Sequence, residues 1–422
     1  MEERKRVVIT GLGVVSAIGQ DVNTYWNNLL NGVCGIDFIT GYPPEELPVK
    51  IAAQIKEFDG EQFGMDKAFI RKQDRFTLFG VAAAWQAVND SGLHADGEEQ
   101  NIDPFRLGVY VGSGIGGFET QYKETLKLLD DPSGQWISPL FIPTMISNIA
   151  AGQIAIKHHA QGPCLDIVTA CATSSHCLGE AFRAIRHGYA DAIIAGGCEN
   201  ATIPLGIAGF ANAKALSRAE DPKYACLPFN LNRKGFVMGD GAAVLVLEEY
   251  EHAKARGAHI YAEMVGYGNT CDAYHATAPR PDGSTQSRAI IDALKEAQFD
   301  EKKDNLYINA HGTGTHLNDV AETVAYKIAL GDFAYKAHIS STKSMTGHMF
   351  GAAGAAEAIA SVLALENGII PPTINLDTPD PECDLDYTPN VAVKAPVNLA
   401  ISDSLGFGGH NACVAFRRWE EQ

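Results

Sequence analysis

The sequence contains no long apolar run, no Cys-x-x-Cys pair and no excess of basic residues. No apolar run approaches the roughly 20 residues of a transmembrane helix, so we do not expect a membrane protein. Nine cysteines, an odd number, are scattered from Cys34 to Cys413, which argues against a disulfide framework and a structural zinc site. The 33 basic and 51 acidic residues give a net charge of −18, which argues against general binding of nucleic acid.

Leader, phosphate-loop and metalloprotease motifs are also missing. The start of the chain, MEERKRVVITGLGVV, is broken by glycines and lacks a small-residue cleavage site, so we expect a first strand and a cytoplasmic protein. One GxGxxG pattern, formed by Gly112, Gly114 and Gly117, follows a predicted strand. No strand ending in an acidic residue appears about 20 residues later, where a dinucleotide site needs one. We interpret the pattern as a tight turn that lets backbones approach closely, and a nucleotide-binding oxidoreductase as a weak alternative.

Short β-branched runs that end in glycine-rich loops alternate with helical stretches along the 422 residues. This alternation predicts a layered α/β fold. A charged helical stretch ends near Gly257, and the strand pattern then restarts, so we expect two halves, 1–257 and 258–422. The β-branched runs are 7–13, 107–117, 191–197, 242–249, 306–315 and 392–409.

Cys171 lies where a short apolar segment gives way to a predicted helix, in the run DIVTACATSSH (166–176). A cysteine at such a corner faces the N-terminus of the helix, whose dipole and free N–H groups favour the thiolate. We therefore expect a pKa below the free value of roughly 8.5 and a nucleophile for acyl transfer. A buried structural cysteine is the alternative. Nearby Cys164 and Cys177 are expected to pack inside.

Two histidines follow predicted strands. His311 begins HGTGT after the strand LYINA, and His348 ends TKSMTGH after the strand HIS. Active sites of α/β sheets gather at strand ends. A single histidine of this kind is more simply interpreted as a structural loop or core residue whose hydrogen bonds are all made. Two such histidines together with Cys171 favour a catalytic site.

Five ordered segments resemble the β-ketoacyl-(acyl carrier protein) synthases, above all the elongating enzymes of type II bacterial fatty acid synthesis. The segments are TACATS (169–174), PFNLNRKGFVMGDGAAVLVLEE (228–249), NAHGTGTHLND (309–319), SSTKSMTGH (340–348) and GFGGHN (406–411). The likeness covers nearly the whole chain. It implies the thiolase fold, with two related halves in a five-layered α/β/α/β/α sandwich, and a homodimer.

The resemblance also implies roles for the matching residues. Cys171 would accept the acyl group, His311 and His348 would drive malonyl decarboxylation, and Lys343 would support the site. Phe407 would be a gate, and its backbone N–H would complete an oxyanion hole with that of Cys171. No redox cofactor or catalytic metal is required.

Further matches concern substrate binding. Thr313 and Thr315 match threonines that bind the pantetheine arm, Thr277 is a further candidate, and Glu322 matches a glutamate near the site. The expected partner is an acyl carrier protein, which is acidic in this family. A local basic patch would have to overcome the repulsion between two acidic proteins. Candidates for this docking patch are Lys67, Arg71, Lys72 and Arg75, at spacings that fit one helix face, and Lys214.

The pair of histidines separates this chain from related enzymes. Thiolases use a second cysteine, priming synthases pair cysteine with His and Asn, and chain-length factors lack the nucleophile. The chain departs from the family pattern at Asn230 and Lys234, where Asp is usual, and at Asp403 and Leu405, where Asn and Phe are usual. Three readings therefore stay open: a fatty acid elongation enzyme, a ketosynthase of a type II polyketide or polyene pathway with a cysteine-less sister chain, and a non-catalytic chain-length partner.

Overall fold

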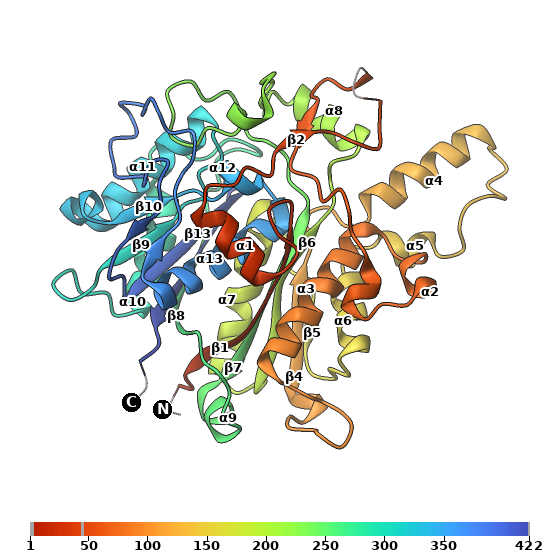
Figure 1. Ribbon diagram of the computed structural model, residues 1–422, viewed down its shortest axis with the longest axis horizontal. Helices are drawn as coiled ribbons and strands as arrows, with labels where there is room; N and C mark the ends of the chain where they lie inside the picture. Colours follow the sequence, from red (N-terminus) through yellow and green to blue (C-terminus); the bar gives the residue numbers. More distant parts are fainter. Residues whose placement is uncertain (1–3, 44–45, 421–422) are drawn as a thin grey trace.

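The computed structural model describes residues 4–43 and 46–420 of the chain (Figure 1). Ten strands form one mixed sheet in the order β10-β9-β13-β14-β8-β1-β7-β6-β4-β5. These strands are β1 (Val7–Ser16), β4 (Leu107–Gly112), β5 (Cys164–Leu165), β6 (Ala192–Glu199), β7 (Gly241–Glu249), β8 (Ala262–Cys271), β9 (Leu306–Asn309), β10 (His338–Ser340), β13 (Leu399–Gly406) and β14 (His410–Arg418). None of the described helices is long and apolar enough to cross a membrane.

The sheet consists of two halves that share one topology. In the first half β1 is antiparallel to β7 and β7 to β6, while β6 and β5 are both parallel to β4. In the second half β8 is antiparallel to β14 and β14 to β13, while β13 and β10 are both parallel to β9. The halves join where Val7–Ile9 pair with Ala262–Met264. The division at Gly257 itself stays a prediction.

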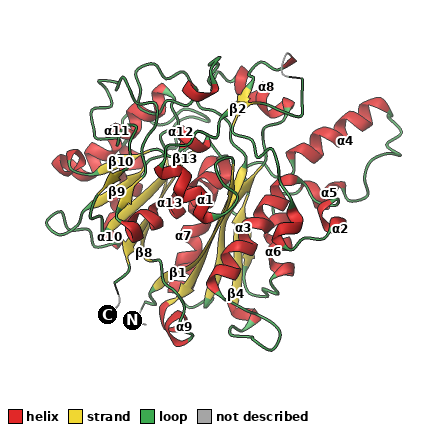
Figure 2. Ribbon diagram, viewed as in Figure 1, coloured by secondary structure: helices red, strands yellow, loops and turns green. Residues whose placement is uncertain are grey.

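Six helices build the layers around the two half-sheets. They are α3 (Arg75–Ser91), α6 (Ile149–Lys157), α7 (Thr173–Arg186), α10 (Ser284–Glu296), α11 (His316–Leu330) and α13 (Ala353–Asn367). The helices α7 and α13 contact strands of both halves and so form a central layer. The first half-sheet carries α3 and α6 on its other side, and the second carries α10 with α11 packed against it (Figure 2). The predicted five-layered sandwich is confirmed.

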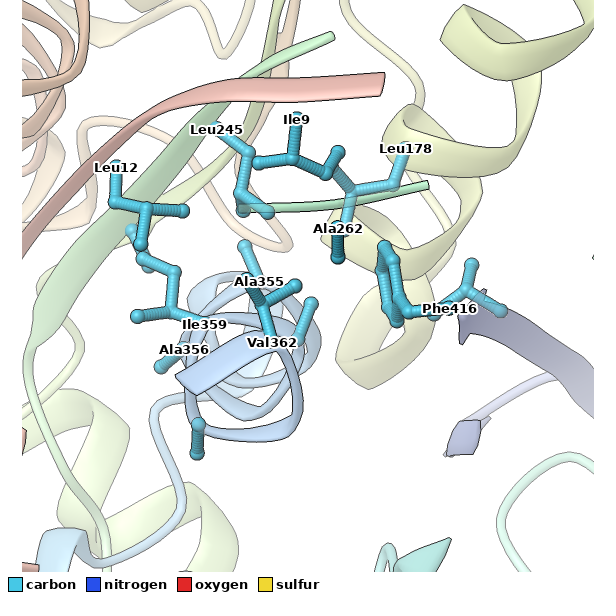
Figure 3. Close-up of a cluster of buried hydrophobic side chains, with 14 of the residues drawn as sticks. Ile9, Leu12, Leu178, Leu245, Ala262, Ala355, Ala356, Ile359, Val362 and Phe416 are labelled. Atoms are coloured by element: carbon cyan, nitrogen blue, oxygen red, sulfur yellow. The ribbon is translucent and has the colours of Figure 1, made fainter. Parts of the chain in front are cut away.

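The central layer forms the largest part of the core. Figure 3 shows Leu178 of α7 and Ile359 of α13 packed among Leu245, Ala262 and Phe416 of the strands. Small side chains make this layer possible, because α13 is surrounded by protein and every residue from Ala353 to Leu365 is buried. A Cβ atom on Gly354 would lie 2.0 Å from the hydroxyl oxygen of Ser175. A larger residue at Gly354 would push the two central helices apart.

The other helices and strands named here lie around the sheet. They are α1 (Val22–Leu30), β2 (Asp37–Phe38), β3 (Ile51–Ala52), α2 (Lys67–Ile70), α4 (Phe118–Asp130), α5 (Phe141–Met145), α8 (Pro204–Asn212), α9 (Tyr250–Ala255), α12 (Lys343–Thr346), β11 (Ile369–Ile370) and β12 (Val393–Lys394). Figure 1 shows α4 projecting from the body of the molecule beside α5.

The repeated topology also places the candidate site. Cys171 lies in the turn that precedes α7, and His348 lies just ahead of Phe350–Ala352, the turn that precedes α13. These two turns contact each other. The chain therefore brings its candidate nucleophile and one candidate histidine together at equivalent points of the two halves.

Candidate active site

The backbone around Cys171 is held in a strained turn. Ala170, which is not a glycine, has a positive φ of 52°, and such backbone strain is typical of functional sites. The turn is fixed by two hydrogen bonds: the N–H of Ala172 donates to the Thr169 carbonyl at 3.1 Å, and the N–H of Thr169 donates to the Thr173 hydroxyl at 2.9 Å. The turn aims Cys171 away from the helix body and towards a cavity.

The expected low pKa of Cys171 is contradicted. Surrounding protein desolvates the thiol and raises its pKa to about 12, although the Lys343 charge and the backbone N–H groups of Phe407 and Cys171 itself lower it. Desolvation therefore outweighs the helix end, and Cys171 rests as a thiol. The expectation for Cys164 is also wrong, because it is exposed on the edge strand β5, whereas Cys177 is buried as expected. In the short apolar segment before Cys171 only Cys164–Leu165 forms a strand, which pairs with β4 at the edge of the sheet.

His311 and His348 lie side by side. Their ring centroids are 5.3 Å apart, with the ring planes at 88°. The Nδ1 atom of each ring is buried and makes no hydrogen bond with the described residues, which leaves Nε2 to reach the cavity. Burial and the nearby Lys343 charge hold the pKa of both imidazoles well below its usual range. Both rings are therefore neutral at neutral pH, and each carries one N–H.

A cavity of about 440 Å³ connects the candidate residues. Its wall includes Cys171, His311, Thr313, Thr315, His348, Phe407 and Thr277. Thr313 and Thr315 lie with their hydroxyl oxygens 3.0 Å apart, whereas Thr277 is exposed nearer the mouth. The cavity thus joins a thiol, two imidazoles and a row of hydroxyl groups, which suits a narrow, partly polar substrate arm.

Lys343 and Glu322 support the site from behind and do not line the cavity. Lys343 is buried and forms an ion pair with Glu357, whose own pKa burial raises to about 7. Glu322 is fully buried and accepts a hydrogen bond of 2.9 Å from the N–H of Gly312, the residue after His311. Lys343 therefore acts through its charge, and Glu322 through the backbone of the histidine loop.

Phe407 lies in the tight turn between β13 and β14. Its side chain is 37% exposed, and its ring centroid lies 6.3 Å from that of Phe210 across the cavity wall. The preceding Gly406 packs so closely that a Cβ atom there would lie 2.3 Å from the carbonyl oxygen of Thr169. Glycine at this position lets the Phe407 N–H face the Cys171 thiol.

The expected basic helix face does not form. Lys67 lies on the four-residue helix α2, Arg71 and Lys72 follow in a turn, and Arg75 begins a separate helix, α3. Arg75 is also committed to structure, because its guanidinium donates to the Ile55 carbonyl at 2.7 Å. Lys67, Arg71 and Lys72 are exposed, but none of them lines the cavity, whereas exposed Lys214 lies at its mouth. In Figure 1, α2 is separated from α8, the helix that precedes Lys214.

Sequence reasoning missed Glu199, a buried carboxylate at the end of β6. It accepts hydrogen bonds from the Ser113 hydroxyl at 2.7 Å, the Gly114 N–H at 2.8 Å and the Gly351 N–H at 3.0 Å. Burial raises its pKa to about 7, and its charge raises that of Cys171. The glycine motif therefore wraps a carboxylate of the protein itself, and its interpretation as a close-approach turn is confirmed. The signal in the sequence was the acidic residue that ends the run AIIAGGCE.

One group of described residues has ligand atoms at metal-binding distances. His316, Asp380 and Glu382 place theirs within 4.8 Å of one another. Asp380 is already paired with Arg233 at 2.6 Å, and His316 and Glu382 are exposed. These contacts fit a surface ion-pair network. The group contains neither the Cys171 thiol nor the two imidazoles of the candidate site.

Comparison with known proteins agrees with the geometry. The model of the β-ketoacyl synthase N-terminal domain matches residues 4–253, and that of the C-terminal domain matches residues 261–377. The chain is 49% identical to the 3-oxoacyl-[acyl-carrier-protein] synthase 2 of Synechocystis sp. over 419 residues, 99% of both chains. It is also 49% identical to the protein of the same name from Staphylococcus aureus over 420 residues, which is 100% of both chains.

Solved structures with the same fold include two ketosynthases. A β-ketoacyl synthase from Burkholderia phymatum matches with a TM-score of 0.90 at 35% identity, over 99% of this chain and 100% of that one. A type II polyketide ketosynthase, bound to a hexaketide and in complex with its acyl-carrier protein, matches with a TM-score of 0.90 at 36% identity over the same shares. The family models and full-length relatives together account for the fold and for nearly the whole sequence, and the chain belongs to the β-ketoacyl synthase family.

Proposed function

We propose that this enzyme condenses an acyl group on Cys171 with malonyl-acyl carrier protein in fatty acid elongation. The observation that carries the proposal is the shared cavity, in which one thiol and two neutral imidazoles meet. The 49% identity to two 3-oxoacyl-[acyl-carrier-protein] synthases over their full length supports the pathway.

The first step transfers the acyl group to the enzyme. The Cys171 sulfur forms a bond to the acyl carbon while the carrier thioester bond breaks, and the thiol proton leaves with the carrier thiol. Negative charge builds on the acyl oxygen during the attack. The backbone N–H groups of Cys171 and Phe407 face this position, and each such donor contributes roughly 3–4 kcal/mol to the transition state by analogy with other oxyanion holes. These donors compensate for the high pKa of the resting thiol.

The second step creates the carbanion. The bond between the malonyl carboxylate and its methylene carbon breaks, carbon dioxide leaves, and the electron pair moves into the thioester as an enolate. The single N–H groups of His311 and His348 can meet the enolate oxygen. The enolate carbon then attacks the acyl carbon on Cys171, the carbon–sulfur bond breaks, and the released Cys171 thiolate takes one proton from water. The product is 3-oxoacyl-acyl carrier protein.

The substrate arm and its carrier need further contacts. We place the pantetheine arm along Thr313, Thr315 and Thr277, because these residues line the cavity from its interior to its mouth. Lys214 is the basic residue best placed to meet an acidic carrier, and Lys67, Arg71 and Lys72 form a second, separate basic group. Charge complementarity of this kind mainly affects association.

A second copy of this chain is the proposed neighbour of the exposed edge strand β5. An edge strand with unpaired backbone groups invites pairing with another strand. Exposed apolar side chains lie on β5 itself, on the segment after it and on α6, which contacts β5: Leu165, Val168 and Ile156. Further exposed apolar side chains lie on α4 and in the α4–α5 loop: Leu126, Leu129 and Trp136. Such clusters mark protein contacts. Analytical ultracentrifugation tests the homodimer directly, and a monomer at micromolar concentration would contradict it.

The polyketide reading has one specific observation in its favour, the fold match to a type II polyketide ketosynthase at 36% identity. One experiment separates the two readings. Purified enzyme is incubated with malonyl-carrier and a series of acyl-carriers, and the products are read by mass spectrometry. Fatty acid elongation predicts one acyl mass on the peptide that holds Cys171 and a single two-carbon extension without a partner chain. Condensation that requires a sister chain would support the polyketide pathway, and condensation by Cys171→Ala would overturn the proposed mechanism.

A further inference from the structure

One buried histidine outside the cavity wall contacts the turn that carries Cys171. The His176 side chain is 3% exposed and lies in the first turn of α7. Its Nδ1 atom is 2.8 Å from the hydroxyl oxygen of Thr169 and 3.0 Å from the carbonyl oxygen of Ala172. These two residues flank Ala170 and Cys171, so the imidazole spans the strained turn from one side to the other.

The hydrogen-bond partners of His176 assign a separate task to each ring nitrogen. Burial, the largest cause, lowers the pKa of His176, so the neutral ring carries one N–H. A carbonyl oxygen only accepts, so this hydrogen belongs on Nδ1, where it serves Ala172 and Thr169 together. The side-chain amide of Asn269 lies 3.1 Å from Nε2, and a half-turn of that amide gives the bare nitrogen an N–H donor. Nδ1 therefore holds the turn, and Nε2 anchors the ring to β8.

The imidazole is itself fixed by the other half of the protein. Its centroid lies 6.2 Å from that of Tyr267 on β8 and 6.3 Å from that of His410 on β14, and both ring pairs meet edge to face. Both strands belong to the second half-sheet, whereas the turn around Cys171 belongs to the first half. A ring packed between such neighbours has few alternative rotamers, so its Nδ1 atom is a rigid support for the turn.

The carbonyl group of Thr169 connects this support to both oxyanion donors. It accepts a hydrogen bond of 3.1 Å from the N–H of Ala172, and Gly406 packs against its oxygen. A Cβ atom on Gly406 would also lie 3.4 Å from the backbone nitrogen of Cys171. A shift of Thr169 would therefore change how the N–H groups of Cys171 and Phe407 are placed relative to each other. A misplacement of about 1 Å can cost about 10²-fold in rate.

We propose that His176 is a positioning residue for the first half-reaction: its Nδ1 atom holds Thr169 and so keeps the Cys171 sulfur and the oxyanion hole aligned for attack on the acyl thioester. This role rests on the proposed acylation of Cys171. His176 does not line the cavity, so its loss should slow acylation without changing how the carrier and its pantetheine arm bind. Release of carbon dioxide should be spared, because it depends on His311 and His348.

Two amide side chains separate the tasks of the two ring nitrogens. The amide of His176→Asn takes the position of Nδ1 and can donate to Thr169 and Ala172, whereas that of His176→Gln takes the position of Nε2 and keeps only Asn269. Single-turnover acylation of Cys171 at saturating acyl-carrier should be about 10–100-fold slower in His176→Gln and within about threefold of wild type in His176→Asn. The carrier concentration that gives half of the maximal rate should be the same in all three proteins.

His187 provides the matched control. Its Nδ1 atom also contacts the carbonyl oxygen four residues earlier, that of Arg183 at 2.8 Å, but the ring is exposed at the far end of α7. His187→Asn and His187→Gln should both be acylated as fast as wild type. Thr169→Val, which removes the hydroxyl partner, should slow acylation and add little to His176→Gln, because the two changes break one contact. Equal rates in His176→Asn and His176→Gln, whether fast or slow, would overturn the positioning role.

Hydrogen exchange gives a readout that does not depend on activity. The peptide of residues 166–176 should exchange faster in His176→Gln than in wild type, because the N–H of Ala172 loses its fixed partner, the Thr169 carbonyl. His176→Asn should exchange as wild type does, and equal exchange in all three proteins would show that the ring does not hold the turn. If wild type fails to condense at all, the proposed function is wrong, and hydrogen exchange still decides whether His176 holds the turn.

Discussion

The rings of His311 and His348 meet edge to face, with their centroids 5.3 Å apart. Their Nδ1 atoms are buried without hydrogen bonds to the described residues, and both rings line the cavity that holds Cys171. Two N–H groups so placed can converge on one oxygen atom, which is the requirement for stabilising an enolate. Burial, assisted by the charge of Lys343 behind them, lowers the pKa of both rings and keeps them neutral.

Removing either histidine should stop decarboxylation and spare acylation. We expect His311→Ala and His348→Ala each to abolish release of carbon dioxide from malonyl-carrier, and the double variant to be little worse, because the two rings act as a unit. Acylation of Cys171 should persist, since it depends on other donors. The measurement is labelled carbon dioxide release beside intact-protein mass. His187→Ala, at the exposed end of α7, is the control, and near wild-type condensation by both single variants would contradict the mechanism.

The pH response follows from the low pKa of the two histidines. Decarboxylation should not change across the ordinary histidine pKa of about 6.5, because both rings stay neutral there. The stability of the protein, in contrast, should depend on pH in this range. Below a pH of about 6.5 the histidines of the unfolded chain bind protons, whereas the buried rings of the folded protein do not. Each ring therefore lowers the free energy of unfolding by about 1.4 kcal/mol for each unit by which the pH falls.

Urea unfolding of wild type and His348→Gln between pH 5 and pH 7 isolates this contribution, because the buried carboxylates affect both proteins equally. The variant should lose stability less steeply than wild type as the pH falls. Equal slopes in the two proteins would show that the folded His348 ring titrates normally.

Much of the fold could be predicted from local sequence patterns. The predictions that the structure contradicts concern features that depend on long-range contacts. The β-branched runs that end in glycines became β1, β4, β6, β7, β9 and β13, because buried strands and close turns leave strong local signals. The relation between the two halves lies in strand order, which no local pattern contains. The basic run from Lys67 to Arg75 was misread because Asp74 caps a new helix through the N–H of Phe76 at 3.2 Å, a signal that aspartate before a helix does give.

The site was only partly predictable for the same reason. Motifs located Cys171 and both histidines, and the structure places all three on one cavity. The pKa of Cys171 was predicted in the wrong direction, because a helix end is visible in sequence, whereas the burial of the thiol by the surrounding protein, which raises its pKa, is not. Glu199 was missed because its partner Gly351 is far away in the chain.

Gly406 should be essential for the oxyanion hole. A methyl group there would lie 2.3 Å from the Thr169 carbonyl oxygen, so Gly406→Ala must move the Phe407 N–H away from Cys171. We expect both half-reactions to slow by about 10²–10³-fold, the typical loss for one oxyanion donor. Rapid-quench kinetics of acylation and of condensation measure the two steps. Gly152→Ala, at a helical position with open space, is the matched control, and a variant that slows only condensation would place the N–H elsewhere.

Phe407 should control which acyl chains enter. The ring is partly exposed in a turn whose Gly408 and Gly409 have positive φ values of 93° and 81°, and glycines at these positions let the loop change conformation. Phe407→Ala should flatten the dependence of acylation rate on chain length, while its backbone N–H still serves the oxyanion hole. Competition between short and long acyl-carriers, read by mass spectrometry, gives the profile. If the folded variant kept the chain-length profile of wild type, the Phe407 ring would have a fixed position and would not control the entry of acyl chains.

The docking of an acidic carrier to a protein of net charge −18 should depend on a few local cations. Salt screens the overall repulsion beyond roughly 8 Å at physiological ionic strength, so contacts at the cavity mouth dominate. Lys214→Glu should raise the KM for acyl-carrier several-fold, and Arg71→Glu with Lys72→Glu should do so if the second basic group also meets the carrier. A short pantetheine thioester should react nearly as fast as with wild type. Lys302→Glu, exposed in the loop between α10 and β9, is the control for general charge. If a docking variant slows both substrates equally, its cation serves folding or catalysis and not the carrier.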